Sequence, residues 1–429
     1  MHNVHTRNTV RYYVLIVAVL AFLFFSNDFG LTDVQKTAIV MAVGIDREED
    51  EFILTSQIAV PQSSKQGDSS QTVQLVSRGK TVAKAFEEIN AKTGWYPKLV
   101  FCKLIILGGK TTEQNVFDAV DFFLLDEYLS DGCLVATCDG LAKDLLNTAA
   151  LVDPSSALAM TKVLSAHAQR VGTVIPVSLR EFASLYFSES KSGLLPVLKT
   201  EPQQEKIGKS GGTGSNDGKN SAQNSQSGSE SGGSNSSSGG SSGGSSQNST
   251  NSGSSGQNAE KPVFSARETA LFVGGKRVGT LNAEETFAYN AVKNELKLAS
   301  YSVTKTEGVC TLSIKQNTPK RKLIVGKDGS ANFNIDLTLT AGLLDNSTAL
   351  PLDELTDGGD VPGSVFTAAQ KKLSGEITTL FEKTKAVGCD VFGVGDLLFK
   401  YENRTLRRFQ STLLPNTTLT VNVRFQNIR

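Results

Sequence analysis

The chain has 429 residues, enough for two or three domains of ordinary size. Its 43 basic residues equal its 43 acidic residues, so no net charge draws it to nucleic acid, and we expect no nucleic-acid partner. Apolar residues make up 39% of the chain, a low share for a globular protein, and one low-complexity segment accounts for much of the deficit.

An apolar run from Tyr12 to Phe25 lies near the N-terminus, with Arg7 and Arg11 before it and acidic residues only after it. This asymmetry is typical of an export signal or a membrane anchor that starts in the cytoplasm. As a helix the run would extend about 21 Å, less than the roughly 30 Å hydrocarbon core, which suits a cleaved signal. Its exit, residues 24–28, lacks the small-residue pattern that cleavage needs. We therefore predict an uncleaved anchor over residues 1–30, with a cleaved signal as the alternative.

Strand and helix patterns alternate in the next part of the chain, which we predict to be N-terminal α+β structure over residues 31–200. Strands are expected over 37–44, 52–60, 98–107 and 133–138, and helices over 81–92, 114–129, 141–148, from 153 onward and 180–187. Gly94 is a candidate C-cap, and Asp153-Pro154 and Ser178 are candidate helix starts.

The segment from Gly208 to Asn258 is almost wholly Ser, Gly, Asn and Gln and has no aromatic residue. Such a composition cannot bury enough apolar area to offset the entropy of ordering, so we predict a disordered tract over residues 203–260. The tract could tether two moving halves, since a flexible coil of ~50 residues spans about 40 Å. We favour an expanded surface loop, because loop-closure cost grows only with the logarithm of length.

After the tract we predict a C-terminal α+β domain over residues 262–429. Gly274-Gly275 is expected to turn a hairpin, and Asn282 with Glu285 three residues later is expected to start a helix. Apolar and polar residues alternate over 332–339 and 419–425, which indicates half-buried strands and a partly antiparallel sheet. One long helix is expected between these strands, with an inner stripe made of Phe366, Ala369, Leu373, Ile377 and Leu380. The predicted fold class is α+β, with two or three mixed sheet-and-helix domains after an N-terminal transmembrane anchor.

The reactive residues form no recognisable catalytic or metal-binding pattern. Gly393–Asp396 lacks the third glycine of a nucleotide loop, and His167 has no nucleophile motif beside it. Asp46 is expected in the turn with residues 48–51, and Glu284-Glu285 at a helix N-terminus, where acids favour the helix dipole. We therefore expect no catalytic residue, no cofactor and no metal site.

The five cysteines are scattered and odd in number, which does not predict a disulfide framework. Cys133 and Cys138 are expected in one strand, where about 17 Å would separate their Cα atoms, too far for a disulfide. We expect most of the cysteines to be small buried apolar residues.

Several short motifs in the right order resemble the C subunit of spore germinant receptors, the Ger(x)C or GerAC family. The resemblance covers essentially the whole chain except the anchor and the tract. The motifs are Val40–Asp46, Leu54–Pro61, Ser77–Thr81, Lys103–Gly108, Glu268–Phe272, Val278–Thr286 and Cys389–Asp396.

This resemblance implies a non-enzymatic protein with an unusual three-domain α+β fold on the outer face of the spore inner membrane. It implies two membrane-protein partners, the A and B subunits of the receptor, in a complex that senses small nutrients bound mainly by those partners. Members of the family usually carry a lipid-attachment cysteine after the signal, whereas the first cysteine here is Cys102. We expect the uncleaved helix to replace the lipid in a single-pass protein whose bulk is extracytoplasmic.

Two other functions stay open from the sequence alone. A membrane-anchored cell-envelope enzyme acting on peptidoglycan would need a buried carboxylate pair. An extracytoplasmic solute-binding module would need a deep polar pocket and saturable binding of an amino acid or a sugar to residues 31–429.

Overall fold

A computed structural model describes residues 12–22, 37–59, 72–165, 172–202, 262–305, 308–346 and 360–428. Residues 12–22 form a short helix whose side chains are exposed. Within the described ranges, no helix has both the length and the apolar character needed to span a membrane. The predicted anchor lies partly outside these ranges, and the predicted disordered tract and His167 lie wholly outside them.

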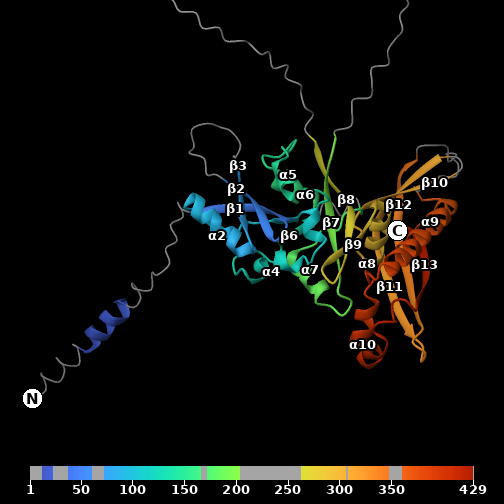
Figure 1. The fold of residues 1–429 in the computed structure, drawn as a ribbon. Helices are drawn as coiled ribbons and strands as arrows, with labels where there is room; N and C mark the ends of the chain where they lie inside the picture. The colour runs from blue at the N-terminus through green and yellow to red at the C-terminus, as the bar shows by residue number, and fades with distance from the viewer. Residues whose placement is uncertain are drawn as a thin grey trace, which may run out of the picture. The chain divides into compact units, whose positions relative to one another are not determined.

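The folded body is built from strands and helices that alternate along most of the chain (Figure 1). The strands are β1 (Thr37–Glu48), β2 (Glu51–Ala59), β3 (Thr72–Gly79), β4 (Tyr96–Lys98), β5 (Leu104–Leu107), β6 (Leu134–Thr137), β7 (Ser192–Glu201), β8 (Val263–Val273), β9 (Lys276–Leu281), β10 (Ala299–Lys305), β11 (Gly308–Val325), β12 (Ala331–Asn346) and β13 (Thr417–Asn427). The helices are α2 (Val82–Thr93), α3 (Gly109–Thr112), α4 (Phe117–Leu125), α5 (Ala142–Asn147), α6 (Ser156–Val163), α7 (Leu179–Tyr186), α8 (Ala283–Lys293), α9 (Gly363–Ala386) and α10 (Val394–Phe409).

The first sheet has nine strands in the order β3-β2-β1-β5-β6-β7-β8-β9, with β4 paired to β1 beside β5. Its centre, from β1 through β5 and β6 to β7, is parallel, whereas β2 and β3 at one end and β8 and β9 at the other are antiparallel. Strands β7 and β8 come from opposite sides of the low-complexity tract, and Glu201 is the register partner of Val263. The sheet therefore continues across the tract, and the division into domains at residues 200 and 262 stays a prediction.

Both faces of this sheet are buried, because alternate residues of its central strands enter two different apolar clusters. Ile105 and Leu107 of β5 pack in the cluster that holds the inner side chains of α2, α4 and α7. Leu104 and Ile106 point the other way and pack with α5 and α6. These two sets of helices lie on opposite sides of the sheet in Figure 1. Burial on both faces explains why the central strands are continuous apolar runs.

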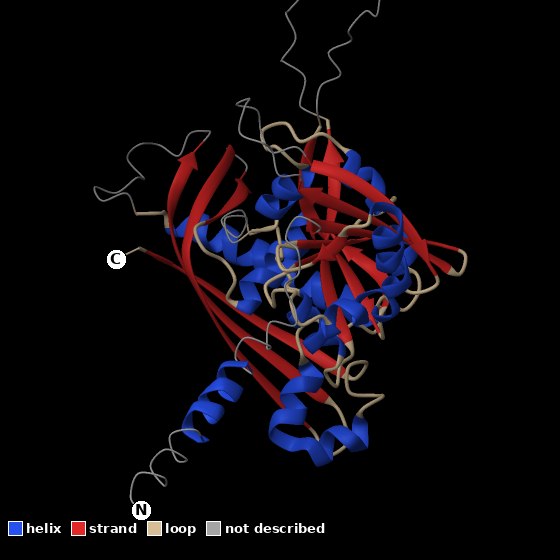
Figure 2. Cartoon of the chain, turned by 90° about the vertical axis from the view of Figure 1, so that its left-hand side faces the viewer, coloured by secondary structure: helices blue, strands red, loops and turns tan. Residues whose placement is uncertain are grey.

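The second sheet has the order β10-β11-β12-β13, with β13 parallel to β12 and the other pairs antiparallel. Figure 2 shows its long strands, of which β11 and β12 have 18 and 16 residues. Phe333, Ile335, Leu337 and Leu339 are buried, while Asn332 and Asp336 between them are exposed. The predicted inner stripe of α9 is also fully buried. The α+β class, the partly antiparallel sheet and this helix are thus confirmed.

Several local predictions are confirmed by backbone geometry. Gly94 ends α2 in the left-handed conformation with φ of 70°. Gly274 and Gly275 turn the β8–β9 hairpin with φ of 56° and 82°, a conformation that favours glycine. Asn282 and Glu285 form a capping box at the start of α8.

Other boundaries differ from the prediction, each for a local reason. The strand expected over 98–107 begins only at Leu104, because the Cys102 N–H donates to the Leu99 carbonyl at 2.8 Å and closes a turn. Helix α6 begins at Ser156 rather than at Asp153-Pro154. The Ser155 hydroxyl accepts the Leu158 N–H at 3.2 Å and is therefore the N-cap.

Candidate functional site

Asp46 is a buried carboxylate in strand β1, not a turn residue as predicted. It is 2% exposed, and burial raises its pKa above the ordinary value. Its two carboxyl oxygens accept the N–H groups of Ala142 at 2.8 Å and Lys143 at 3.0 Å, at the start of α5. The group therefore caps a helix, and both of its oxygens are occupied in the described fold.

The glycine motif Gly393–Asp396 is organised by a second buried carboxylate, Asp390. The Asp390 oxygens accept the N–H groups of Val394 at 2.9 Å and Gly395 at 2.7 Å, in the first turn of α10. Burial raises the pKa of Asp390. A protein carboxylate thus occupies the helix N-terminus where a nucleotide phosphate would bind.

The second acidic pair considered in the sequence, Glu284-Glu285, joins two helices. Glu285 completes the capping box of α8 and pairs with Lys383 of α9, whose Nζ lies 2.7 Å from a carboxylate oxygen. Its burial and its partners give it a structural role in packing α8 against α9.

The cysteine thiols, like the acidic side chains described above, are enclosed by the fold. All five cysteines are free and buried, and burial raises the pKa of Cys138 and Cys389 to about 12. Thiols with so high a pKa hold almost no thiolate at neutral pH, which is the nucleophilic and metal-binding form. No group of three or more His, Cys, Asp or Glu side chains that could hold a metal ion occurs among the described residues.

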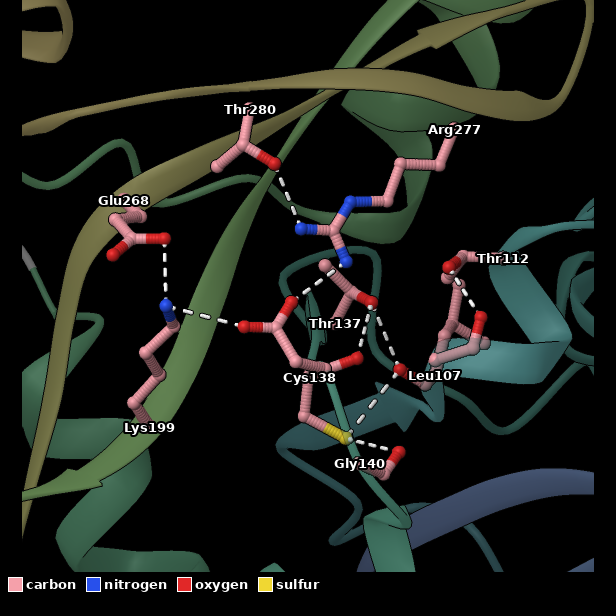
Figure 3. A network of polar contacts seen from close by, with 11 residues as sticks. Leu107, Thr112, Thr137, Cys138, Gly140, Lys199, Glu268, Arg277 and Thr280 are labelled. Carbon is pink, nitrogen blue, oxygen red and sulfur yellow. Dashed lines mark hydrogen bonds and ion pairs between the residues drawn. The ribbon is translucent and has the colours of Figure 1, made fainter.

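The most developed polar arrangement at the surface lies where β6 ends, beside β7, β8 and β9 (Figure 3). We call it the β6-end cluster, and its members are Asp139, Lys199, Glu268 and Arg277. Asp139 accepts from Arg277 Nη1 at 2.9 Å and pairs with Lys199 Nζ at 3.1 Å. Lys199 also donates to Glu268 at 2.7 Å. The cluster therefore links side chains from both sides of the low-complexity tract.

The charged side chains of the β6-end cluster stabilise one another in their ionised forms. Burial disfavours ionisation of Asp139, but Arg277 and Lys199 outweigh that effect and lower its pKa. The hydrogen bond to Glu268 raises the pKa of Lys199. The side chains are partly exposed to solvent, with Asp139 at 50%, so solvent screens these interactions strongly.

A cleft of about 360 Å³ lies beside the β6-end cluster and is lined by residues 138–141 and 198–200 together with part of α5. Its size would suit a small solute. Lys199 is the cation on its wall, and this group already donates to Glu268 and pairs with Asp139. A solute carboxylate would have to displace one of these partners.

Nothing local in the sequence indicated the β6-end cluster. Asp139 follows a predicted strand, but Lys199 lies on β7, a strand that the sequence did not predict. Arg277 lies on β9, which joins the sheet only through the pairing of β7 with β8 across the tract. Without that register, no spacing rule connects Asp139 to Arg277.

Two family models match the chain, one in each half. The first, described as a spore germination protein N-terminal domain, matches residues 31–200. The second, described as spore germination B3/GerAC like, C-terminal, matches residues 267–429. The chain therefore belongs to the GerAC-like family of spore germination proteins, and the resemblance found in the sequence motifs is confirmed.

The fold is similar to the crystal structure of the GerBC protein, with a TM-score of 0.51 and 16% sequence identity. The similarity covers 90% of this chain and 97% of that one. At this identity the likeness shows the fold alone. No curated protein matches the chain.

Proposed function

We propose that this chain is a non-enzymatic subunit of a spore germinant receptor, the counterpart of the C subunit, on the outer face of the spore inner membrane. The observation that carries the proposal is the match to both GerAC-like family models, in order, on either side of the tract. The A and B subunits of the receptor are its proposed partners, and it contributes to their assembly and to the triggering of germination.

The proposed attachment to the membrane is the N-terminal apolar run from Tyr12 to Phe25. Arginines precede it and acidic residues follow it, an asymmetry that supports a start in the cytoplasm and a folded body outside. No cysteine follows the run before Cys102, so the segment itself takes the place of a lipid anchor.

The arrangement of the acidic side chains supports a non-catalytic role. Asp46, Asp390 and Glu285 each accept hydrogen bonds from a helix start or form an ion pair between helices. A general acid or base must instead present its carboxyl group to a substrate. The nutrient is proposed to bind mainly to the partner subunits, as the resemblance to the C subunit implies.

Germination of spores that lack this chain tests the proposal. We expect the loss of optical density that follows addition of the nutrient to disappear, and the full-length chain to restore it. A version in which residues 1–30 are replaced by a cleaved export signal should be exported without restoring germination. Normal germination without the chain, or release of wall fragments by the purified full-length chain, would overturn the proposal.

A further inference from the structure

Six large apolar side chains lie in two segments of the chain, residues 95–101 and 125–128, each of which contains a turn, and each side chain is at least 36% exposed. We call them the aromatic surface, made of Trp95, Tyr96, Val100, Phe101, Leu125 and Tyr128. Single exposed apolar residues are common on soluble proteins, whereas several of them in two segments bridged by one side chain, Lys98, favour a surface that meets something else.

The first of the two turns is held rigidly with its apolar tip outward. Leu99 and Cys102 are buried, and the Cys102 N–H donates to the Leu99 carbonyl at 2.8 Å. This bond fixes the two residues between them, Val100 and Phe101, in solvent. Glycine and polar residues dominate turns, so packing within the described part of the chain does not explain two consecutive exposed apolar residues there.

The second turn lies beside the first. Its backbone is fixed by Asp126, whose carboxylate oxygen accepts the N–H groups of Tyr128 and Leu129 at 2.9 Å each. Leu125, just before it, is 82% exposed. Lys98 bridges the turns, because its Nζ lies 4.8 Å from the centre of the Tyr128 ring and 6.0 Å from that of Tyr96.

An apolar groove continues the aromatic surface between α2 and α4. It has a volume of about 290 Å³, and Phe86, Tyr96, Leu99 and Phe122 line it. The Phe86 and Phe122 rings stack with their centres 5.2 Å apart. Core side chains therefore already fill the space beneath the aromatic surface, and the exposed side chains have no room to turn inward.

The place of the aromatic surface in the fold limits its distance from the N-terminal apolar run. Strand β4 pairs in parallel with the start of β1, so that Tyr96 is the register partner of Thr37 and Pro97 that of Ala38. Thr37 begins the folded body, and the N-terminal apolar run ends at Phe25. The twelve residue steps from Phe25 to Thr37 span at most about 40 Å, so an anchor ending at Phe25 keeps this surface within about that distance of the bilayer.

We propose that the aromatic surface docks onto the lipid headgroup layer of the membrane that holds the N-terminal run. This inference rests on the membrane attachment in the proposed function. Trp and Tyr rings favour the membrane–water interface, where one part of the ring is apolar and another is wet. Phe101, Val100 and Leu125 would reach the acyl boundary, and Lys98 would keep its ammonium among the phosphates.

The charges around the aromatic surface indicate whether the lipid contact would be apolar or electrostatic. Lys98 and Lys103 flank the first turn and Asp126 and Glu127 lie in the second, so cations and anions balance and the surface carries no net positive charge for anionic lipids. Docking should therefore depend on apolar burial and change little with salt, unlike attraction by a polybasic segment.

Trp95 is the only tryptophan of the chain, so its fluorescence reports on this surface alone. The test uses the full-length chain reconstituted into phosphatidylcholine vesicles, with and without lipids brominated near the headgroup end of the acyl chains. We expect the brominated lipids to quench Trp95 emission at least twofold, equally at low and high salt.

Two variants show whether the surface is responsible. Replacing Phe101 and Leu125 together by serine (F101S/L125S) should remove most of the quenching, because the contact loses its deepest side chains. Phe399→Ser, which changes an exposed phenylalanine of α10, is the matched control and should leave the quenching unchanged. Circular dichroism of each variant verifies that it is folded.

Each other outcome overturns the inference in a distinguishable way. If Trp95 is unquenched while the chain stays in the vesicles, docking is wrong and the membrane attachment stands. If Trp95 is shielded from both aqueous acrylamide and brominated lipid, protein covers the surface instead, either a second copy or the N-terminal run. If the chain washes off the vesicles, the membrane attachment in the proposed function fails as well.

Discussion

Asp46 and Asp390 perform the same task in two places, since each buried carboxylate receives two N–H groups at the start of a helix. Helix starts leave such donors unsatisfied, and a buried start needs an acceptor from elsewhere in the chain. These two buried carboxylates therefore close the starts of α5 and α10.

The contact of Gly108 with Asp46 gives a test at this scale. A Cβ added at Gly108 would lie 2.0 Å from an Asp46 carboxylate oxygen, so Gly108→Ala forces the carboxylate away from α5. We expect a loss of about 2 kcal/mol or more of unfolding free energy, because buried donors lose their acceptor. Thermal unfolding of the full-length chain in mild detergent measures this loss.

The neighbouring Gly140 supplies the control for that substitution. A Cβ at Gly140 meets nothing within 4 Å, so Gly140→Ala should change stability by less than about 0.5 kcal/mol. Equal effects of the two substitutions would contradict the capping role of Asp46.

Among the elements, the pairing of β7 with β8 determines how the two family regions are connected. These strands pair along most of their length, and the β6-end cluster adds ion pairs across the same junction. The region between residues 202 and 262 therefore joins two strands whose ends are already side by side.

Shortening the connection between β7 and β8 tests whether its length is needed for stability or for germination. Because Glu201 and Val263 are register partners, residues 203–260 can be replaced by Asn-Gly without stretching the chain. Closing a loop of a few residues instead of ~60 should stabilise the fold by about 2 kcal/mol, seen as a higher thermal midpoint.

The same shortened chain distinguishes the two roles considered for the tract. If the tract is a tolerated surface loop, spores that carry the shortened chain germinate normally. Loss of germination with a stable fold would favour a tether, and loss of the fold itself would contradict the β7–β8 pairing.

The elements that the sequence predicted were those with a clean period or a clear cap, such as α2, α9 and the β8–β9 hairpin. Strand β7 was missed because Pro196 lies in its interior, where a proline argues against a strand. Strand β11 extends through Pro319 and a polar stretch, since it pairs with β12 along a long hairpin with one wet face. Helix α10 is kinked at Glu402, where φ is −144°, and this interrupts its helical period.

At the scale of the whole molecule, the family was identified from short motifs in a fixed order along the chain and not from a functional site. The family was visible in short segments such as Val40–Asp46 and Cys389–Asp396, and both family models match around them. The aromatic surface was not visible, because Val100 and Phe101 looked like the interior of one strand over 98–107. Only the turn closed between Leu99 and Cys102 separates buried from exposed residues there.

The fold in turn places the aromatic surface at the start of the body, through the pairing of Thr37 with Tyr96. Anchor, surface and body would then form one continuous attachment to the bilayer.

The most direct test of the receptor assignment is affinity purification of the tagged full-length chain from solubilised spore inner membranes. We predict that two membrane proteins, the A and B subunits, are retained with it in comparable amounts, and that both are lost from a mock purification of untagged spores. Recovery of the chain alone, from the soluble fraction, would contradict the account.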